Sequence, residues 1–346
     1  MANLLPIKFI SPSSFYYWEK CPLLSVFKLN FGDTKIFPQH PDADLGTLIH
    51  TLIENRRKWS INDYKTFEIK WEEEIHKINN HYKNDVLQKV YYPIEWNSKY
   101  YAVKKNLLRT NLIKEHSNIE HETSPFEFEK WIDDGVNIGG RVDMVKFNDR
   151  KEIVEIIDIK TGNIFEYIDN KKSIKQAYYY QLALYTHLVL TKQNRLPSCY
   201  IQDSKGEKFR VEINLMHVKE IYNKAVDLKK RINTCVEKMD LESLASPTYD
   251  GCLFCNYRPL CTRYKAEFIN NFSNRTVDLY GEILKINYAK RSTITIKVCN
   301  KTLTLKNILS IEEIKVGDAI YVYNLYCPDE NENTLFATKT TIVKYD

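Results

Sequence analysis

The sequence predicts an α/β fold, with a mixed sheet flanked by helices, followed by a small β-barrel. Three observations lead to this prediction. The first part of the 346-residue chain alternates amphipathic helix-length segments with short apolar runs. A stretch rich in Glu, Lys and aromatic residues, 62–122, has helical spacing and interrupts that alternation. From about Thr276 onward the pattern consists of short strands, with no helical segment of comparable strength.

Composition allows a globular enzyme and does not by itself identify a partner. Hydrophobic residues make up 43% and charged residues 27%, and the net charge of +5 permits a nucleic-acid partner without requiring one. No apolar run approaches the length of a membrane span, and Met1–Ile10, interrupted by Pro6 and Lys8, does not resemble a signal peptide. We therefore expect a cytoplasmic protein without membrane contact. Eight cysteines without a secretion signal argue against a disulfide framework.

Helices are expected at the start of the chain. Ser11–Ser14 contains a helix-start signal with an internal proline, and a helix should run from Phe15 to Cys21. A second helix should run from about Leu45 to Lys58. Within the interrupting stretch, Trp71–Ile78 and Tyr101–Lys114 have helical spacing, so we interpret it as a helical arm.

The central sheet begins with an antiparallel run. Phe126–Trp131, Val136–Phe147 and Glu152–Lys160 are predicted strands. Asp134-Gly135 is a turn signal, and Asn148–Lys151 should form the hairpin between the second and third strands.

The pattern then alternates again. A helix is predicted over 173–192, strands at Cys199–Gln202 and Phe209–Ile213, and a helix from about Met216 to Met239. A cysteine-rich stretch, 251–261, closes this part of the chain.

The last 70 or so residues predict a barrel. Five short strands fit an OB-like barrel, and an SH3-like barrel is the close alternative. We expect a domain at 1–270 and the barrel at 271–346. The strands are predicted at Val277–Asn287, Ser292–Val298, Lys301–Leu305, Ala319–Leu325 and Thr334–Val343.

Two predicted strands carry carboxylates. Gly139-Gly140-Arg141-Val142-Asp143 is followed, after 14 residues, by Asp158-Ile159-Lys160. Asp158 and Lys160 are two positions apart, so they share one side of a strand that follows an apolar run. Charges delivered to a core are costly unless they pair or coordinate something. Phosphodiester hydrolysis needs a divalent cation on carboxylates and a nearby positive charge. The alternative is an exposed ion pair on a surface hairpin.

Further residues complete a known pattern. His50 ends Gly46-Thr47-Leu48-Ile49-His50, and Gln181 and Tyr185 share one helix face at i and i+4. In order along the chain, these motifs resemble the RecB-like branch of the PD-(D/E)XK nuclease superfamily. That branch has a Gly-x-x-x-His helix, a Gly-x-x-Asp strand, an Asp/Glu-x-Lys strand and a Gln-x-x-x-Tyr helix. The serine-led helix from Ser13 into Cys21-Pro22 also resembles the start of that family.

The resemblance covers roughly residues 11–265 and assigns expected roles. It implies the PD-(D/E)XK core fold and a bound Mg²⁺ or Mn²⁺. The implied metal ligands are His50, Asp143, Asp158 and the Ile159 carbonyl, Lys160 is the implied catalytic lysine, and Gln181 and Tyr185 would steady the active site or contact the DNA backbone.

Four cysteines form a second pattern. Cys252, Cys255 and Cys261 are a compact set of soft ligands, and Cys21 is the remote candidate for a fourth. Zinc sites usually have two Cys-x2-Cys pairs, so zinc is the alternative interpretation. The arrangement resembles iron–sulfur RecB-like nucleases, including AddB and CRISPR-associated RecB-like exonucleases. This resemblance implies a structural [4Fe–4S] cluster joining the ends of the domain.

Basic and aromatic residues suggest nucleic-acid contacts in two places. Near the cysteines, Tyr257, Arg258 and Arg263 could stack on bases and pair with phosphates, or only shield the cluster. In the barrel the candidates are Lys285, Lys290 and Arg291, with a solvated lysine face or a protein-docking surface as alternatives.

Together these features predict a Mg²⁺- or Mn²⁺-dependent DNA nuclease. The family resemblance favours an exonuclease acting on single-stranded ends, in DNA processing, repair or antiviral defence. The chain has no phosphate-binding loop of the Gly-x-x-x-x-Gly-Lys-Ser/Thr type, so a helicase, if one is needed, would act in trans. The alternatives are a non-catalytic nucleic-acid-binding subunit of a helicase–nuclease complex and an RNA-directed nuclease.

Overall fold

A computed structural model describes the chain at residues 4–32, 34, 36–56, 58–109, 125–288, 292–308, 314–328 and 333–345. The chain forms two compact units. Unit 1 comprises 1–32 and 39–246, and unit 2 comprises 33–38 and 247–346. In the described ranges, every helix is too short or too polar to traverse a lipid bilayer.

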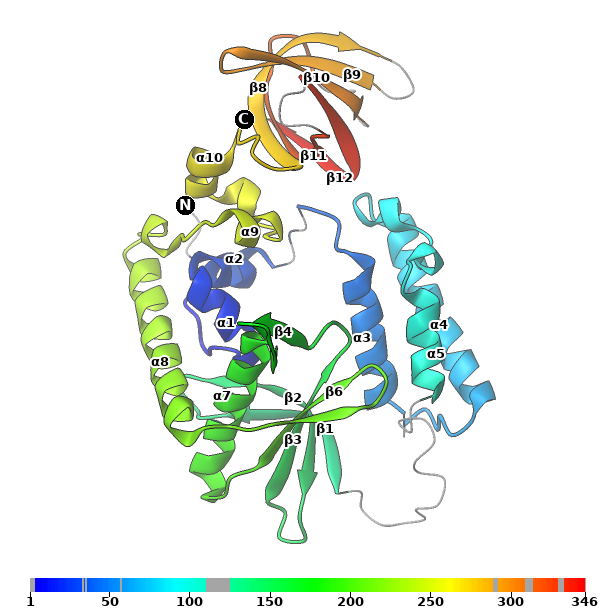
Figure 1. The fold of residues 1–346 in the computed structure, drawn as a ribbon, viewed down its shortest axis with the longest axis vertical. Helices are drawn as coiled ribbons and strands as arrows, with labels where there is room; N and C mark the ends of the chain where they lie inside the picture. The colour runs from blue at the N-terminus through cyan, green and yellow to red at the C-terminus, as the bar shows by residue number, and fades with distance from the viewer. Residues whose placement is uncertain are drawn as a thin grey trace. The chain divides into compact units, whose positions relative to one another are not determined.

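Unit 1 is built on a five-stranded mixed sheet (Figure 1), which confirms the predicted α/β class. The strand order is β1-β2-β3-β6-β7, with β3 and β6 parallel and the other neighbours antiparallel. The predicted hairpin at 148–151 is present between β2 and β3. The strands are β1 (Phe126–Asp133), β2 (Gly139–Phe147), β3 (Ile153–Lys160), β6 (Ser198–Asp203) and β7 (Lys208–Val211).

A group of helices packs beside this sheet. Helix α7 packs on β1 and β3 and lies between α1 and α8, and α1 also contacts β2. Leu182, Leu184 and Leu188 of α7 are fully buried, which explains why this helix is apolar on most of its circumference. The helices are α1 (Pro12–Lys20), α2 (Leu23–Phe31), α7 (Gln176–Gln193) and α8 (Leu215–Glu237), followed by the 3-10 turn η3 (Glu242–Leu244).

A second group of helices packs against Ile159 of the sheet and forms a separate apolar cluster. Helix α3 begins with Pro41 and has Asp42 and Asp44 in its first turn, which suits the positive end of the helix. Helix α4 begins with a capping box made by Asp63 and Thr66. The elements are α3 (Pro41–Glu54), α4 (Tyr64–Asn84), η1 (Gln88–Tyr91), η2 (Ile94–Trp96) and α5 (Tyr100–Arg109). Residues 110–122 of the predicted arm lie outside the described residues.

The structure contains a hairpin that the sequence analysis missed. Strands β4 (Phe165–Ile168) and β5 (Lys171–Ile174) pair antiparallel directly after the Asp-x-Lys strand. The prediction of a helix from residue 173 was therefore wrong at its start, because α7 begins at Gln176. Asp169 and Asn170, which join the two strands, both have positive φ, 49° and 60°. Two such residues favour a tight type I′ connection.

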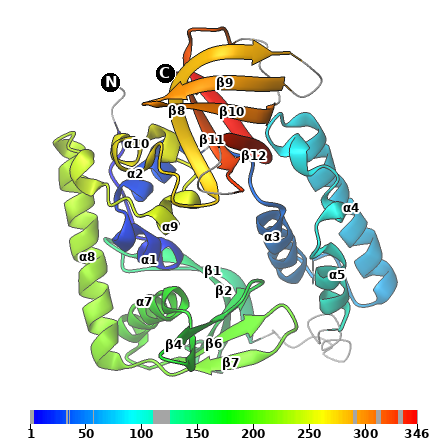
Figure 2. The ribbon, with the colours of Figure 1, turned by 45° about the horizontal axis from the view of Figure 1, so that its top comes forward.

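Unit 2 contains a closed five-stranded barrel (Figure 2), which confirms the predicted small barrel and its strand count. The barrel order is β10-β12-β11-β8-β9, and only β10 and β12 run parallel. Inward-facing apolar residues such as Leu279, Ile296 and Leu305 fill its interior. The strands are β8 (Thr276–Asn287), β9 (Ser292–Val298), β10 (Lys301–Ile308), β11 (Ala319–Tyr326) and β12 (Thr334–Tyr345).

The cysteine-rich segment precedes the barrel in unit 2 and is anchored to it. It comprises α9 (Tyr249–Leu253), η4 (Arg258–Leu260) and α10 (Thr262–Phe268). Arg258, 2% exposed, donates to the Asp278 carboxylate of β8 at 2.6 Å, and Tyr264 donates to the same carboxylate at 2.7 Å. A buried charge pair of this kind is tolerated because each partner satisfies the other. The segment and the barrel therefore share one core.

Candidate active site

Three carboxylates lie on one row across three neighbouring strands. The β2–β3 register pairs Met144 with Ile157, so the next step along both strands brings Asp143 opposite Asp158. The β1–β2 register pairs Phe128 with Met144 and Lys130 with Val142, which brings Glu129 opposite Asp143. Directly opposed residues of antiparallel strands have neighbouring side chains. The row concentrates negative charge at one position of the sheet.

The regular strand ladder is modified on this row. The Asp143 carboxylate accepts a hydrogen bond from the Ile159 backbone N–H at 2.6 Å. The Asp143 side chain thus accepts a hydrogen bond that a backbone carbonyl of a neighbouring strand would accept in a regular ladder. Glu129 has a φ of 50°, a conformation that non-glycine residues rarely adopt. Strained backbone that persists in a sheet often marks a functional position.

Asp158 and Lys160 form a largely buried pair on β3. Lys160 Nζ lies 2.7 Å from Asp158 Oδ2, and the Gln181 side chain of α7 donates to Asp158 Oδ1 at 2.6 Å. The Asp158 side chain is only 2% exposed, whereas that of Lys160 is 21% exposed. Asp158 Oδ2 has no donor with good hydrogen-bond geometry within the described structure. This buried oxygen retains capacity for another electrophilic partner.

Burial and neighbouring charges shift the pKa values of the groups in this pair and of Asp143. Burial raises the pKa of Asp158 to about 6, opposed chiefly by the Lys160 ammonium. Burial also raises the pKa of Asp143. Burial alone would lower the pKa of Lys160, but the carboxylates of Asp158 and Asp143 outweigh it and raise that pKa. One lysine therefore balances more than one buried carboxyl group.

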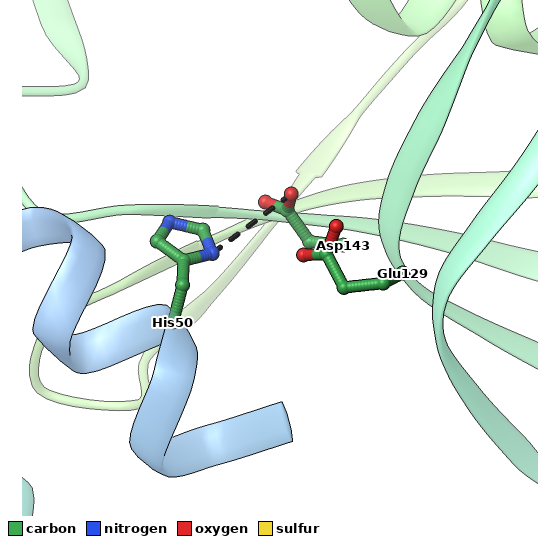
Figure 3. A group of neighbouring side chains, drawn as sticks. All are labelled: His50, Glu129 and Asp143. Atoms are coloured by element: carbon green, nitrogen blue, oxygen red, sulfur yellow. Dashed lines mark ion pairs between the residues drawn. The ribbon is translucent and has the colours of Figure 1, made fainter. Parts of the chain in front are cut away.

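His50 extends from α3 toward the carboxylate row. Its Nδ1 lies 3.9 Å from Asp143 Oδ1, and Figure 3 shows His50, Glu129 and Asp143 pointing toward one another. One ligand atom from each of the three lies within 4.8 Å of the others. Burial and, next, Lys160 lower the pKa of His50, which keeps the imidazole neutral and able to donate a lone pair. Burial also raises the pKa of Glu129.

The donor set fits a hard divalent cation. Carboxylate oxygens with one neutral imidazole are suitable ligands for Mn²⁺, and the carboxylates alone suit Mg²⁺. The converging atoms of His50, Glu129 and Asp143, together with the Asp158 carboxylate beside them, meet the requirement for several ligands. Glu129 was not among the residues predicted from sequence, because its place in an alternating strand made it look like an outward polar side chain.

Tyr185 supports the strand that carries Asp143. Its hydroxyl donates to the Arg141 carbonyl of β2 at 2.6 Å, and the Tyr185 side chain is buried. A Cβ at Gly140 would lie 2.9 Å from that hydroxyl and 2.8 Å from the ring of Pro12. Gly140 therefore permits α1 and α7 to approach β2 closely. Gln181 and Tyr185 of the same helix face both reach the site, one through Asp158 and one through β2.

The four cysteines of the second pattern belong to different parts of the chain. Cys21 follows α1 in unit 1, whereas Cys252, Cys255 and Cys261 lie within the short segment of unit 2. The three in unit 2 are half-buried. Cys261 Sγ accepts a hydrogen bond from the Tyr264 N–H at 3.4 Å, the kind of contact that stabilises a sulfur ligand.

The predicted nucleic-acid contacts have varied surroundings. The guanidinium of Arg258 is buried and forms an ion pair with Asp278 in the interior of unit 2. Arg258 is therefore not accessible as a DNA contact, contrary to the prediction. Arg263 is exposed and pairs with Glu267 at 2.9 Å, and Tyr257 is half-buried. Lys285 is exposed on β8. Lys290 and Arg291 lie outside the described residues.

Comparison with known families settles the class of this site. The sequence model of the PD-(D/E)XK nuclease superfamily matches residues 10–262, which is most of the chain and includes every residue of the carboxylate row. The chain belongs to the PD-(D/E)XK nuclease superfamily. Membership makes it a nuclease, and the matched range contains Asp143, Asp158 and Lys160.

Similarity of this PD-(D/E)XK nuclease to solved structures is distant. It aligns with a candidate exonuclease from Eubacterium rectale at 12% identity and a TM-score of 0.35, over 67% of this chain and 82% of that one. It also aligns with the tetrameric p202 HIN2 structure at 14% identity and a TM-score of 0.19, over 21% of this chain. The alignment spans 42% of the HIN2 chain. No curated protein matches the sequence.

Proposed function

We propose that this nuclease hydrolyses DNA phosphodiester bonds with Mg²⁺ or Mn²⁺, and that it acts as an exonuclease on single-stranded ends. The observation that carries the proposal is the convergence of His50, Glu129 and Asp143 beside the buried Asp158–Lys160 pair. The proposed ligands are His50, Asp143, Asp158, the Ile159 carbonyl and, in addition, Glu129. A cation held there would polarise the scissile phosphate and lower the pKa of an attacking water.

The protein's own residues have separate roles in this proposal. Lys160 places its ammonium beside the site, where it can stabilise negative charge that develops on the phosphate. Gln181 fixes the orientation of Asp158 through the 2.6 Å hydrogen bond. Tyr185 holds β2, and with it Asp143, in register. Such supporting contacts maintain the geometry on which catalysis depends.

The direct test is a cleavage assay with labelled single-stranded DNA, matched RNA and double-stranded DNA, with Mg²⁺, Mn²⁺ or a chelator. We expect metal-dependent shortening of DNA from an end. Cleavage of RNA alone would favour the RNA-directed alternative. Binding of DNA without cleavage under all these conditions would favour a non-catalytic binding subunit, or a nuclease that needs a helicase supplied in trans.

Glu129 gives a prediction that does not depend on turnover. Replacing Glu129 by Gln is expected to weaken Mn²⁺ binding about 10- to 100-fold, because one converging carboxylate is lost. Isothermal titration of the DNA-free protein with Mn²⁺ measures this directly. Glu127→Gln is the matched control, since Glu127 lies on the same strand, is exposed and pairs with Lys130. Equal affinities of the two variants would remove Glu129 from the ligand set.

We further propose that Cys21, Cys252, Cys255 and Cys261 hold a structural [4Fe–4S] cluster. Four thiolates form a complete ligand set for such a cluster, and the Tyr264 N–H already donates to the Cys261 sulfur. Closing the long chain segment between Cys21 and Cys252 would restrict the unfolded state. Anaerobic purification followed by metal analysis should give about four iron atoms per chain. A zinc protein would support the alternative site.

We propose a nuclease domain at 1–270 followed by an OB-like barrel at 271–346, although the compact unit that contains the barrel begins at residue 247. The closed five-stranded barrel of mixed strand direction supports the OB-like assignment. We propose that Lys285, Lys290 and Arg291 contact DNA together with Tyr257 and Arg263.

A further inference from the structure

A second cationic position lies beside the active site. The ring of Tyr178, in the first turn of α7, lies near two lysines. Lys160 Nζ is 5.2 Å and Lys175 Nζ 5.9 Å from the ring centroid. Both lysines and the tyrosine belong to unit 1. The proposed catalytic lysine and Lys175 thus both lie close to one aromatic side chain.

Two polar groups at this position are not used in ion pairs or hydrogen bonds among the described residues. Among the described residues, the Lys175 ammonium has no carboxylate within ion-pair distance and the Tyr178 hydroxyl has no hydrogen-bond partner. The nearby Glu166 carboxylate is used differently, accepting from the Gln176 N–H at 2.8 Å. Burial raises the pKa of Tyr178, so its hydroxyl stays protonated and remains a donor. A cation and a neutral donor together suit a phosphate oxygen.

Helix α1 extends this surface. Tyr16 contacts Tyr180 of α7 edge-on, with ring centroids 5.8 Å apart, and Lys20 Nζ lies 4.3 Å from the Tyr16 ring. Tyr17 is 52% exposed, and its hydroxyl acts electrostatically on Tyr178. Lysines interspersed with tyrosines are typical of surfaces that follow a single strand, with cations for phosphates and rings for bases.

We propose that Lys175 and the Tyr178 hydroxyl bind the phosphate next to the scissile one on the substrate strand. The inference rests on the proposed function, since Lys160 defines where the scissile phosphate lies. Phosphates follow one another closely along a strand, with about 3.4 Å of helix axis per phosphate on each strand of a duplex. Two lysines near one ring can therefore meet neighbouring phosphates. Lys175 and Tyr178 position the strand and do not take part in bond cleavage.

The test measures the salt dependence of binding, which cleavage does not affect. A fluorescent single-stranded oligonucleotide is titrated with protein in chelator at several salt concentrations, and its integrity is checked on a gel. Losing one phosphate contact lowers the slope of log K against log salt by about 0.7 for a single strand. We expect Lys175→Gln to lower the slope by that amount. Tyr178→Phe should weaken binding at every salt concentration with the slope unchanged, since it removes a neutral donor.

Lys205→Gln is the matched control, because Lys205 is exposed on a turn of the same unit. Thermal unfolding of each variant checks that the fold is intact. A Lys175→Gln slope equal to those of Lys205→Gln and the unaltered protein would overturn the inference, even if the protein cleaves DNA. A protein that shows the predicted slope change but never cleaves would contradict the proposed function and leave the phosphate site standing. Absence of any single-strand binding would overturn the inference as well.

Discussion

Replacing Asp158 by alanine is expected to reduce DNA cleavage by about a thousandfold or more, the scale seen when a key electrostatic contact is removed. Asp158 is the most deeply buried carboxylate of the row and contacts both Lys160 and Gln181. Its loss removes a proposed metal ligand and leaves the ammonium of Lys160 without its nearest partner. Single-turnover cleavage at saturating Mn²⁺ measures the loss, and binding of labelled DNA in chelator should change little.

Two further variants make this prediction specific. Asp149→Ala, in the exposed hairpin turn between β2 and β3, should cleave normally. Asp158→Asn keeps the shape of the side chain and its acceptor for Gln181, so it separates loss of charge from loss of packing. If Asp158→Asn retained full activity, charge at this position would not matter, and the assignment of the active site to the carboxylate row would have to be abandoned.

Much of the candidate site could be proposed from sequence because its short motifs, taken in order along the chain, resemble those of a known family. Asp158 and Lys160 sit two residues apart at the end of an apolar run, and strand geometry alone places them on one side. Gln181 and Tyr185 share a helix face by their spacing of four. His50 ends an apolar helical face, where a lone histidine is more often a core residue, so its role as a ligand follows from the family resemblance. For these pairs, a short stretch of sequence shows both the residue types and the side of the strand or helix that they share.

Glu129 could not be predicted in this way. Phe126–Trp131 alternates apolar and polar residues, so Glu129 matches Glu127 and looks equally solvent-facing. Its approach to Asp143 depends on strand register and on a φ of 50°, and neither is visible in the residue pattern. Register is fixed by the packing of the whole sheet. Some of the candidate ligands can therefore be recognised only once the tertiary structure is known.

Arg258 is the opposite case, a residue predicted from sequence as a DNA contact that is buried in the structure. An arginine beside cysteines and tyrosines looked like a phosphate contact, but it is buried against Asp278, which lies 20 residues further along the chain on a barrel strand. Long-range pairing of this kind has no local signature. By contrast, the β4–β5 hairpin did have one, because Asp169-Asn170 between alternating segments is a pair suited to a tight turn.

Replacing Lys160 by methionine is expected to reduce the rate of cleavage about 100- to 1000-fold, with metal and DNA binding retained. Methionine keeps the length and the packing of the side chain on Tyr178 but removes its charge. Lys146→Met is the matched control, because Lys146 also forms a strand-to-strand pair in this sheet, with Glu155 at 3.1 Å. A purely structural lysine at 160 would give rates like those of the Lys146 variant.

The pH profile of Lys160→Met separates a charge effect from a packing effect. Lys160 is the main influence that lowers the pKa of Asp158 from where burial alone would place it. Without that ammonium the pKa of Asp158 is expected to rise further, so the carboxylate forms only at higher pH. The residual activity of Lys160→Met should therefore rise at a more alkaline pH than that of the unaltered enzyme. A profile of unchanged position, with only its height reduced, would mean that Lys160 does not control the charge of Asp158 during turnover.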